Sequence, residues 1–101
     1  MRITYSPTAD IGLNKILVYG IENWGEEQAY TFFISLFDEV KLLKTYPEIG
    51  QTYHPKNKAL GLNNLRKFLF KGYQIFYQIN PDEIYIYAIV AKGADVGEVL
   101  G

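Results

Sequence analysis

The chain has 101 residues and a net charge of −1; 49% of its residues are hydrophobic and 16% aromatic, and it contains one histidine and no cysteine. This length and composition predict one globular domain, residues 1–101. Without cysteine the chain can form neither disulfides nor thiolate metal sites. Because no secretory segment and no long apolar run is present, we expect a cytoplasmic protein that does not interact with membranes.

The first half of the chain predicts one strand and two helices. Residues 2–5 alternate in polarity, as a short strand does. Ser6 and Pro7 are typical of a helix N-cap and first helical position, and a second helix follows from residue 24 and ends before Pro47. The residues expected to face the core are Ala9, Leu13, Ile16 and Tyr19 in the first helix, and Ala29, Phe33, Leu36, Val40 and Leu43 in the second.

The second half of the chain changes to the two-residue period of strands. Residues 51–64 are expected to be mostly loop, and strands are expected at 65–71, 73–79 and 84–90. Together these elements predict an α+β fold of order β-α-α-β-β-β. In it, the N-terminal strand and the two-helix hairpin pack on one face of a small antiparallel sheet.

The other face of this sheet is expected to be open. Strict alternation turns Tyr73, Ile75, Tyr77, Ile79, Ile84, Ile86, Ala88 and Val90 toward the helices, together with Phe68 and Phe70. The residues left for the open face are Lys67, Lys71, Gln74, Phe76, Gln78, Tyr85 and Tyr87, with Ile89 also outward. So aromatic a surface favours a binding face.

The helices also carry more apolar residues than two core-facing stripes require. The surplus consists of Ile11, Leu17, Ile21, Phe32, Ile34 and Phe37. Single exposed apolar residues are ordinary, but this number on one helical hairpin favours a docking surface for a partner over simple packing. Leu17, Ile21, Phe32 and Phe37 are the candidate contacts.

Charge is distributed unevenly. Residues 1–49 carry four Lys/Arg against seven Asp/Glu, whereas residues 50–101 carry six against four. Five basic residues and no acidic one lie between His54 and Pro81. Because the whole chain is slightly acidic, we expect little direct binding to nucleic acid.

The order of these landmarks resembles the ParE/RelE toxin superfamily. The stretch "SPTADIGLNKILVYGIENWGEEQA" (6–29) is similar to the superfamily's opening: Ser-Pro, an Ala two residues on, Leu, Ile and Tyr at helical spacing, then Trp-Gly and Gln-Ala. "YPEIG" (46–50) is similar to its Pro-x-x-Gly after the second helix. "LRKF" (65–68) and "YQIFYQI" (73–79) are similar to Leu-Arg-x-Phe and Tyr-x-Ile-Phe-Tyr of ParE-like members. The resemblance covers most of the chain and is closer to the ParE-like branch.

The resemblance implies a toxin of a type II toxin–antitoxin pair, neutralised by a cognate antitoxin whose C-terminal segment wraps the helical hairpin and the sheet. ParE-like members inhibit DNA gyrase without known hydrolytic chemistry, whereas RelE-like members cut mRNA on the ribosome. The implied partners are therefore an antitoxin and either DNA gyrase or the ribosome. Neither a metal nor another cofactor is implied.

The resemblance also allows the RNA-cleaving chemistry to be checked residue by residue. Cleavage through the 2′-OH needs a base, a proton donor and cations around the charged phosphorane. Lys67 matches one lysine position of RelE-like enzymes and Lys92 another. Gln74 and Gly93 stand where arginines are expected, and Leu100 where a C-terminal tyrosine is expected. The missing groups favour a binding inhibitor over an enzyme.

Two further residues have open interpretations. Arg66 is a candidate for a catalytic or binding role, or for a structural pair with a helix carboxylate such as Glu39. His54 lies in a loop without a second histidine and is expected to be ordinary surface. We therefore favour a ParE-like gyrase inhibitor. The alternatives are a ribosome-dependent mRNA endonuclease and a non-toxic family member that only binds a partner.

Overall fold

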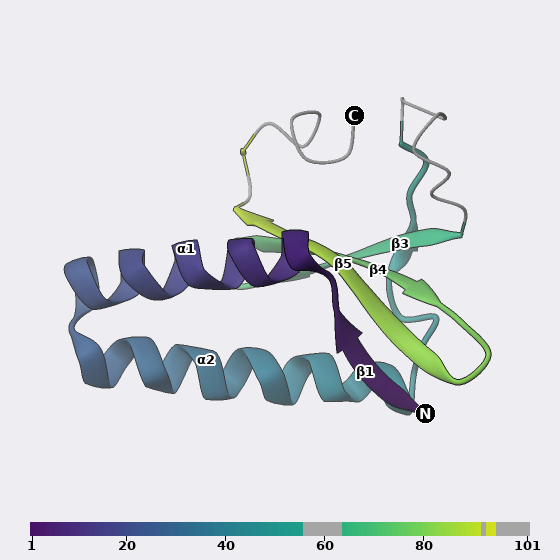
Figure 1. Cartoon of the computed structure of the whole chain (residues 1–101), viewed down its shortest axis with the longest axis horizontal. Coiled ribbons are helices and arrows are strands. Elements are labelled where there is room, and N and C mark those ends of the chain that lie inside the picture. The colour runs from purple at the N-terminus through teal and green to yellow at the C-terminus, as the bar shows by residue number, and fades with distance from the viewer. Residues whose placement is uncertain (56–63, 92, 95–101) are drawn as a thin grey trace.

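The computed structural model describes residues 1–55, 64–91 and 93–94. Two antiparallel helices pack beside one sheet, which confirms the α+β fold (Figure 1). The elements are β1 (Arg2–Tyr5), α1 (Pro7–Trp24), α2 (Glu26–Lys41), the short 3-10 helix η1 (Leu42–Lys44), β2 (Gln51–Thr52), β3 (Leu65–Phe70), β4 (Tyr73–Ile79) and β5 (Glu83–Ala91).

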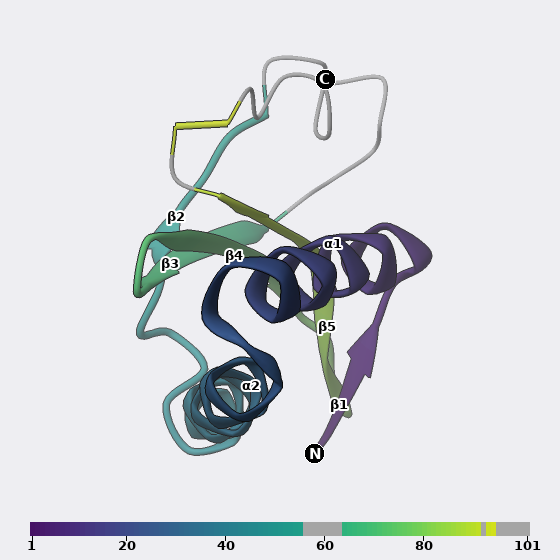
Figure 2. The same ribbon diagram turned by 90° about the vertical axis from the view of Figure 1, so that its left-hand side faces the viewer.

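The sheet has five strands in the order β1-β5-β4-β3-β2. Strands β3, β4 and β5 pair antiparallel, as expected. The short strand β2 lies in a segment expected to be mostly loop, and it pairs antiparallel with β3. The N-terminal strand β1 differs from the expectation, because it joins the edge of the sheet and runs parallel to β5, from Arg2 beside Glu83 to Tyr5 beside Ile86. The sheet is therefore mixed. Helix α1 lies on β5, and α2 lies alongside α1 (Figure 2).

The main hydrophobic core lies between the helices and one face of the sheet. Most of the expected helix residues are in it: Ala9, Ile16, Leu36, Val40 and Leu43 are buried, and Leu13 and Phe33 pack against them. Tyr19 is the exception, since 53% of its surface is exposed. Within the described part of the chain, neither helix combines the length and the apolar character needed to cross a membrane.

A β-bulge in β5 changes which side chains face the helices. Phe76 of β4 pairs with Ala88, but the next residue, Tyr77, pairs with Ile86, so Tyr87 is the extra residue. Ile89 therefore faces the main core and is only 3% exposed, whereas Ala88 packs on the opposite face of the sheet. The expectation of strict alternation through residues 84–90 holds up to Tyr87 and was wrong from Ala88 onward.

Helix α1 approaches β5 closely at Gly12. A Cβ atom on Gly12 would lie 2.4 Å from the carbonyl oxygen of Ile89, which is well inside van der Waals contact. Only glycine permits this approach of helix to strand. This close approach fixes the position of α1 over the end of β5, and the two elements together form one side of a surface groove.

Candidate functional site

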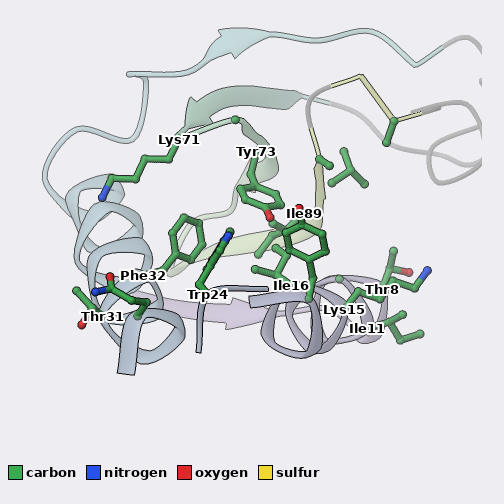
Figure 3. Close-up of a pocket in the computed structure, with 17 residues that line it drawn as sticks. Thr8, Ile11, Lys15, Ile16, Trp24, Thr31, Phe32, Lys71, Tyr73 and Ile89 are labelled. Carbon is green, nitrogen blue, oxygen red and sulfur yellow. The ribbon is translucent and has the colours of Figure 1, made fainter. Parts of the chain in front are cut away.

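A groove of about 1180 Å³ lies between α1, the start of α2 and the ends of β4 and β5 (Figure 3). Its walls come from segments far apart in the sequence. Helix α1 supplies Ile11, Gly12, Ile16 and Tyr19; the helix junction and α2 supply Trp24 and Phe32; and the sheet supplies Tyr73 and Ile89. The groove is therefore mostly apolar and aromatic.

Aromatic rings hold one another in place along this groove. The ring centroids of Trp24 and Phe32 are 5.5 Å apart, and those of Phe32 and Tyr73 are also 5.5 Å apart. Tyr19 meets Trp24 edge-on at 5.7 Å. Burial raises the pKa of Tyr73, with a smaller contribution from Tyr19. Tilted and edge-on contacts of this kind are favourable, so the groove is formed before any partner arrives.

Several of these residues remain open to solvent. Ile11 is 58% exposed and Trp24 is 40% exposed, although both are large and apolar. The charged residues that line the groove within the described part of the chain are two lysines, Lys15 on α1 and Lys71 in the turn between β3 and β4. An exposed apolar hollow with a few charged groups at its edge is typical of a binding site.

The structure brings one of the four candidate docking residues into this groove. Phe32 lines it, whereas Leu17, Ile21 and Phe37 do not. Leu17 lies on a different side of α1 from Ile11, because the six positions between them correspond to a rotation of about 120° around the helix. Phe37 packs edge-on against Tyr5, with ring centroids 6.0 Å apart.

The helical hairpin that the sequence predicts as a docking surface forms part of this groove, but most of the groove residues are not among the four candidates. Ile11, Lys15 and Tyr19 follow a spacing of four along α1, and this pattern was available in the sequence. The helical spacing of Tyr19 predicts a core position instead, and Ile11 belongs to the apolar surplus without being a candidate contact. In the sequence, Trp24 indicates the start of the second helix and gives no sign of a binding role.

The expectation of an open second sheet face was wrong at its centre. Phe76 is completely buried in a second small core with Leu65 and Ala88. The ring of Tyr53, which follows β2, covers Phe76 with a centroid distance of 5.0 Å. Gln74 is only 9% exposed. Tyr53 is held in this position by its backbone N–H, which donates to the carbonyl oxygen of Leu65 at 2.8 Å.

The other residues expected on this face are not gathered into one cationic site. Lys67 is half-buried, with its Nζ atom 5.7 Å from the centroid of the Tyr53 ring. Lys71 instead lines the groove on the helix side, and its Nζ atom lies 5.3 Å from the centroid of the Phe70 ring. Tyr85 and Tyr87 are half-buried.

Arg66 holds the loop after η1. Its guanidinium donates to the carbonyl oxygen of Gly50 at 2.8 Å and to that of Glu48 at 3.3 Å, so it does not pair with Glu39. The hydroxyl of Tyr77 donates to the carbonyl oxygen of Pro47 at 2.7 Å and accepts from the Gly50 N–H at 2.9 Å. Arg66 is therefore occupied by backbone carbonyls, which is a structural role.

The last two candidates from the sequence are Lys92 and His54. Lys92, the third candidate for catalysis, lies outside the described residues, and His54 is exposed. Among residues 1–55, 64–91 and 93–94, no group of three or more His, Cys, Asp or Glu side chains is placed to hold a metal ion.

Comparisons with known proteins point to one family. A family model described as "ParE toxin of type II toxin-antitoxin system, parDE" matches residues 3–95. The chain also resembles a solved structure titled "Chromosomal ParDE TA system from P. aeruginosa", with a TM-score of 0.72 and 17% sequence identity; the match covers 90% of this chain and 95% of that chain. At this identity the likeness concerns the fold. No curated protein matches the chain.

Proposed function

Because the chain belongs to the ParE toxin family of type II toxin–antitoxin systems, we propose that it is the toxin of such a pair and that an antitoxin segment neutralises it by occupying the groove. The observation that carries this proposal is the exposure of large apolar side chains, such as Ile11 and Trp24, in a hollow with a preformed aromatic floor. A segment with an apolar face that fills such a hollow would remove this surface from water.

We further propose that the free toxin inhibits DNA gyrase by binding it. The covered sheet face supports binding over RNA cleavage, because Phe76 and Gln74 are buried where a nuclease would need exposed cations. Lys67 and Lys71 lie toward opposite sides of the sheet, so they cannot act together on one phosphate.

The groove is tested by a matched pair of substitutions. Ile11 lines the groove and is 58% exposed, while Ile34 on α2 lies outside it and is 64% exposed. Both side chains are largely in solvent in the free chain, so Ile11→Asn and Ile34→Asn should cost similar stability. The binding partner in the assay is the cognate antitoxin, which is to be sought among the products of the neighbouring reading frames. We expect Ile11→Asn to weaken its binding about tenfold or more, as expected for an apolar side chain buried on association.

Ile34→Asn should leave the affinity almost unchanged. Equal losses for the two variants would contradict the assignment of the groove as the antitoxin site.

The target is tested separately with purified chain released from its antitoxin. We expect it to block supercoiling of relaxed plasmid by gyrase, and addition of the antitoxin to restore the activity. Unchanged supercoiling would refute gyrase as the target. Cleavage of mRNA in a translating extract that is lost with Lys67→Ala would instead identify a ribosome-dependent nuclease.

A further inference from the structure

The charged side chains in the described lining of the groove have one sign. The whole chain has 11 acidic and 10 basic residues, yet the described lining of the groove contains Lys15 and Lys71 and no Asp or Glu. The ion pairs among the described residues join Arg2 to Glu83 and Lys41 to Asp38, so neither groove lysine takes part in one. Both ammonium groups are therefore available to a partner.

The two lysines lie on opposite sides of the aromatic floor. Figure 3 shows Lys71 beyond Phe32 on the α2 side, and Lys15 on α1 beyond Trp24 and Ile16. A segment lying along the floor would pass between them. Its apolar side chains would contact the rings, and its polar side chains would meet one lysine on each side.

The backbone at Lys71 supplies an independent observation. Lys71 has φ = 44° and is followed by Gly72 with φ = 86°, so both central residues of this hairpin turn have positive φ. Turns of this kind favour Asn, Asp or Gly, because at positive φ the Cβ atom crowds the following carbonyl oxygen. Glycine has no Cβ, and the side chains of Asn and Asp offset the strain by local hydrogen bonds, which Lys cannot do. The contact of Nζ with the Phe70 ring directs the side chain but does not require positive φ. Strain in the backbone at the edge of a site is a pointer to function.

We propose that the segment that fills the groove is an apolar peptide carrying at least two carboxylates, one for Lys15 and one for Lys71. This inference rests on the proposed function of the groove and adds the chemistry of its partner. When the groove is covered, the ammonium groups lose water and need opposite charges. A neutral or basic segment would leave them unpaired, so the two lysines select among partner segments.

Single-stranded nucleic acid is the competing class of ligand, because stacked aromatics and lysines also bind bases and phosphates. The structure favours the peptide. Two cations would neutralise few phosphates, and the net charge of the chain is −1, whereas nucleic-acid binding depends on many phosphate contacts.

The probe is a random peptide library displayed on phage and selected on the full chain. We expect the recovered peptides to combine several apolar residues with two or more Asp or Glu. Selection on the double variant Lys15→Gln/Lys71→Asn should recover apolar peptides without the acidic enrichment. A recovered acidic peptide should bind this variant about three- to tenfold more weakly, as expected for two partly exposed ion pairs.

The choice of Asn at position 71 separates binding from folding. Asn tolerates positive φ better than Lys does, so Lys71→Asn should have an equal or higher Tm while losing affinity for acidic peptides. A variant that lost both stability and affinity would show that Lys71 serves the turn rather than the partner.

Ile11→Asn separates failure of this inference from failure of the proposed function. Peptides that need Ile11 but are neutral, or that ignore the lysine substitutions, would overturn the carboxylate inference and leave the groove intact as a docking site. Peptides that bind Ile11→Asn as tightly as the unmodified chain would overturn both. Binding of a single-stranded oligonucleotide as tightly as the acidic peptides, lost in the double variant, would replace the peptide with a nucleic acid.

Discussion

Ser6, which precedes α1, donates a hydrogen bond from its hydroxyl to the carbonyl oxygen of Tyr87, the extra residue of the bulge in β5. The same hydroxyl oxygen accepts from the N–H of Ala9 at 2.9 Å and so caps the helix. The N–H of Ser6 donates to the carbonyl oxygen of Ile86, also at 2.9 Å. One buried serine therefore joins the start of α1 to the bulge in β5, after which the alternation of side chains between the two faces of the sheet is shifted by one residue.

The substitution Ser6→Ala should destabilise the fold. It removes the cap and leaves the N–H of Ala9 and the carbonyl of Tyr87 without this partner in a buried position. We expect the free energy of unfolding, measured by urea denaturation, to fall by about 1–3 kcal/mol. Thr31→Ala is the control, because Thr31 is exposed and its hydroxyl only donates to Glu27 within α2. If Ser6→Ala and Thr31→Ala lowered the free energy of unfolding by the same small amount, the hydrogen bonds of the Ser6 hydroxyl would not contribute measurably to stability.

Much of the fold could be predicted from the sequence because its signals are local. The cap at Ser6, the helical spacing of Leu36, Val40 and Leu43, and the alternation in β4 each act over a few residues. The bulge could not be predicted in this way. It depends on the pairing of β5 with β4 and on Ser6, which is 81 residues from Tyr87.

The site was harder to predict for a similar reason. Counting apolar residues identified the helical hairpin and Phe32, but the groove is completed by Tyr73 and Ile89 from the sheet. Ile89 reaches the helix side only because of the bulge. Likewise, the covering of Phe76 by Tyr53 depends on the pairing of Tyr53 with Leu65, which is distant in the sequence and which no periodic pattern encodes.

The substitution Gly12→Ala should be destabilising, although replacing glycine by alanine inside a helix usually stabilises the helix by about 0.5–1 kcal/mol. The new Cβ would lie 2.4 Å from the carbonyl oxygen of Ile89, so α1 would have to move away from β5. We expect a net loss of about 1–3 kcal/mol, measured by thermal or urea unfolding. Asn14→Ala, at an exposed position of the same helix, should be neutral or slightly stabilising. A Gly12→Ala variant with a raised Tm would show that α1 is not tightly seated.

The substitution Tyr77→Phe tests the loop that Arg66 also holds. Loss of the hydroxyl leaves the Gly50 N–H without its acceptor and the Pro47 carbonyl without its donor, while the buried ring remains. We expect the free energy of unfolding to fall by about 1–2 kcal/mol, and hydrogen exchange of the Gly50 amide to accelerate. Tyr30→Phe, at a residue that is 52% exposed, should change neither quantity. Unchanged exchange at Gly50 in Tyr77→Phe would contradict the role given to this hydroxyl.

Stability should decline in alkaline solution, and Tyr5 should account for part of the decline. Burial, with a smaller effect from Asp10, raises the pKa of Tyr5 to about 12 from its ordinary value of 10.0. The folded chain then keeps a proton that the unfolded chain loses, so this contribution to stability is complete below pH 10 and decreases as the pH rises toward 12. Tyr5→Phe keeps a ring against Phe37 and should show a shallower decline in urea denaturation across this range.

Asp10→Asn provides the matched comparison, because it removes the nearby negative charge and leaves the tyrosine in place. Asp10→Asn should change the alkaline decline in stability less than Tyr5→Phe does, because burial is the larger cause of the raised pKa of Tyr5. If Tyr5→Phe declined as steeply as the unmodified chain, the alkaline loss would belong to other groups. Tyr73 and Tyr77, whose pKa values burial also raises, would then be the residues to substitute next.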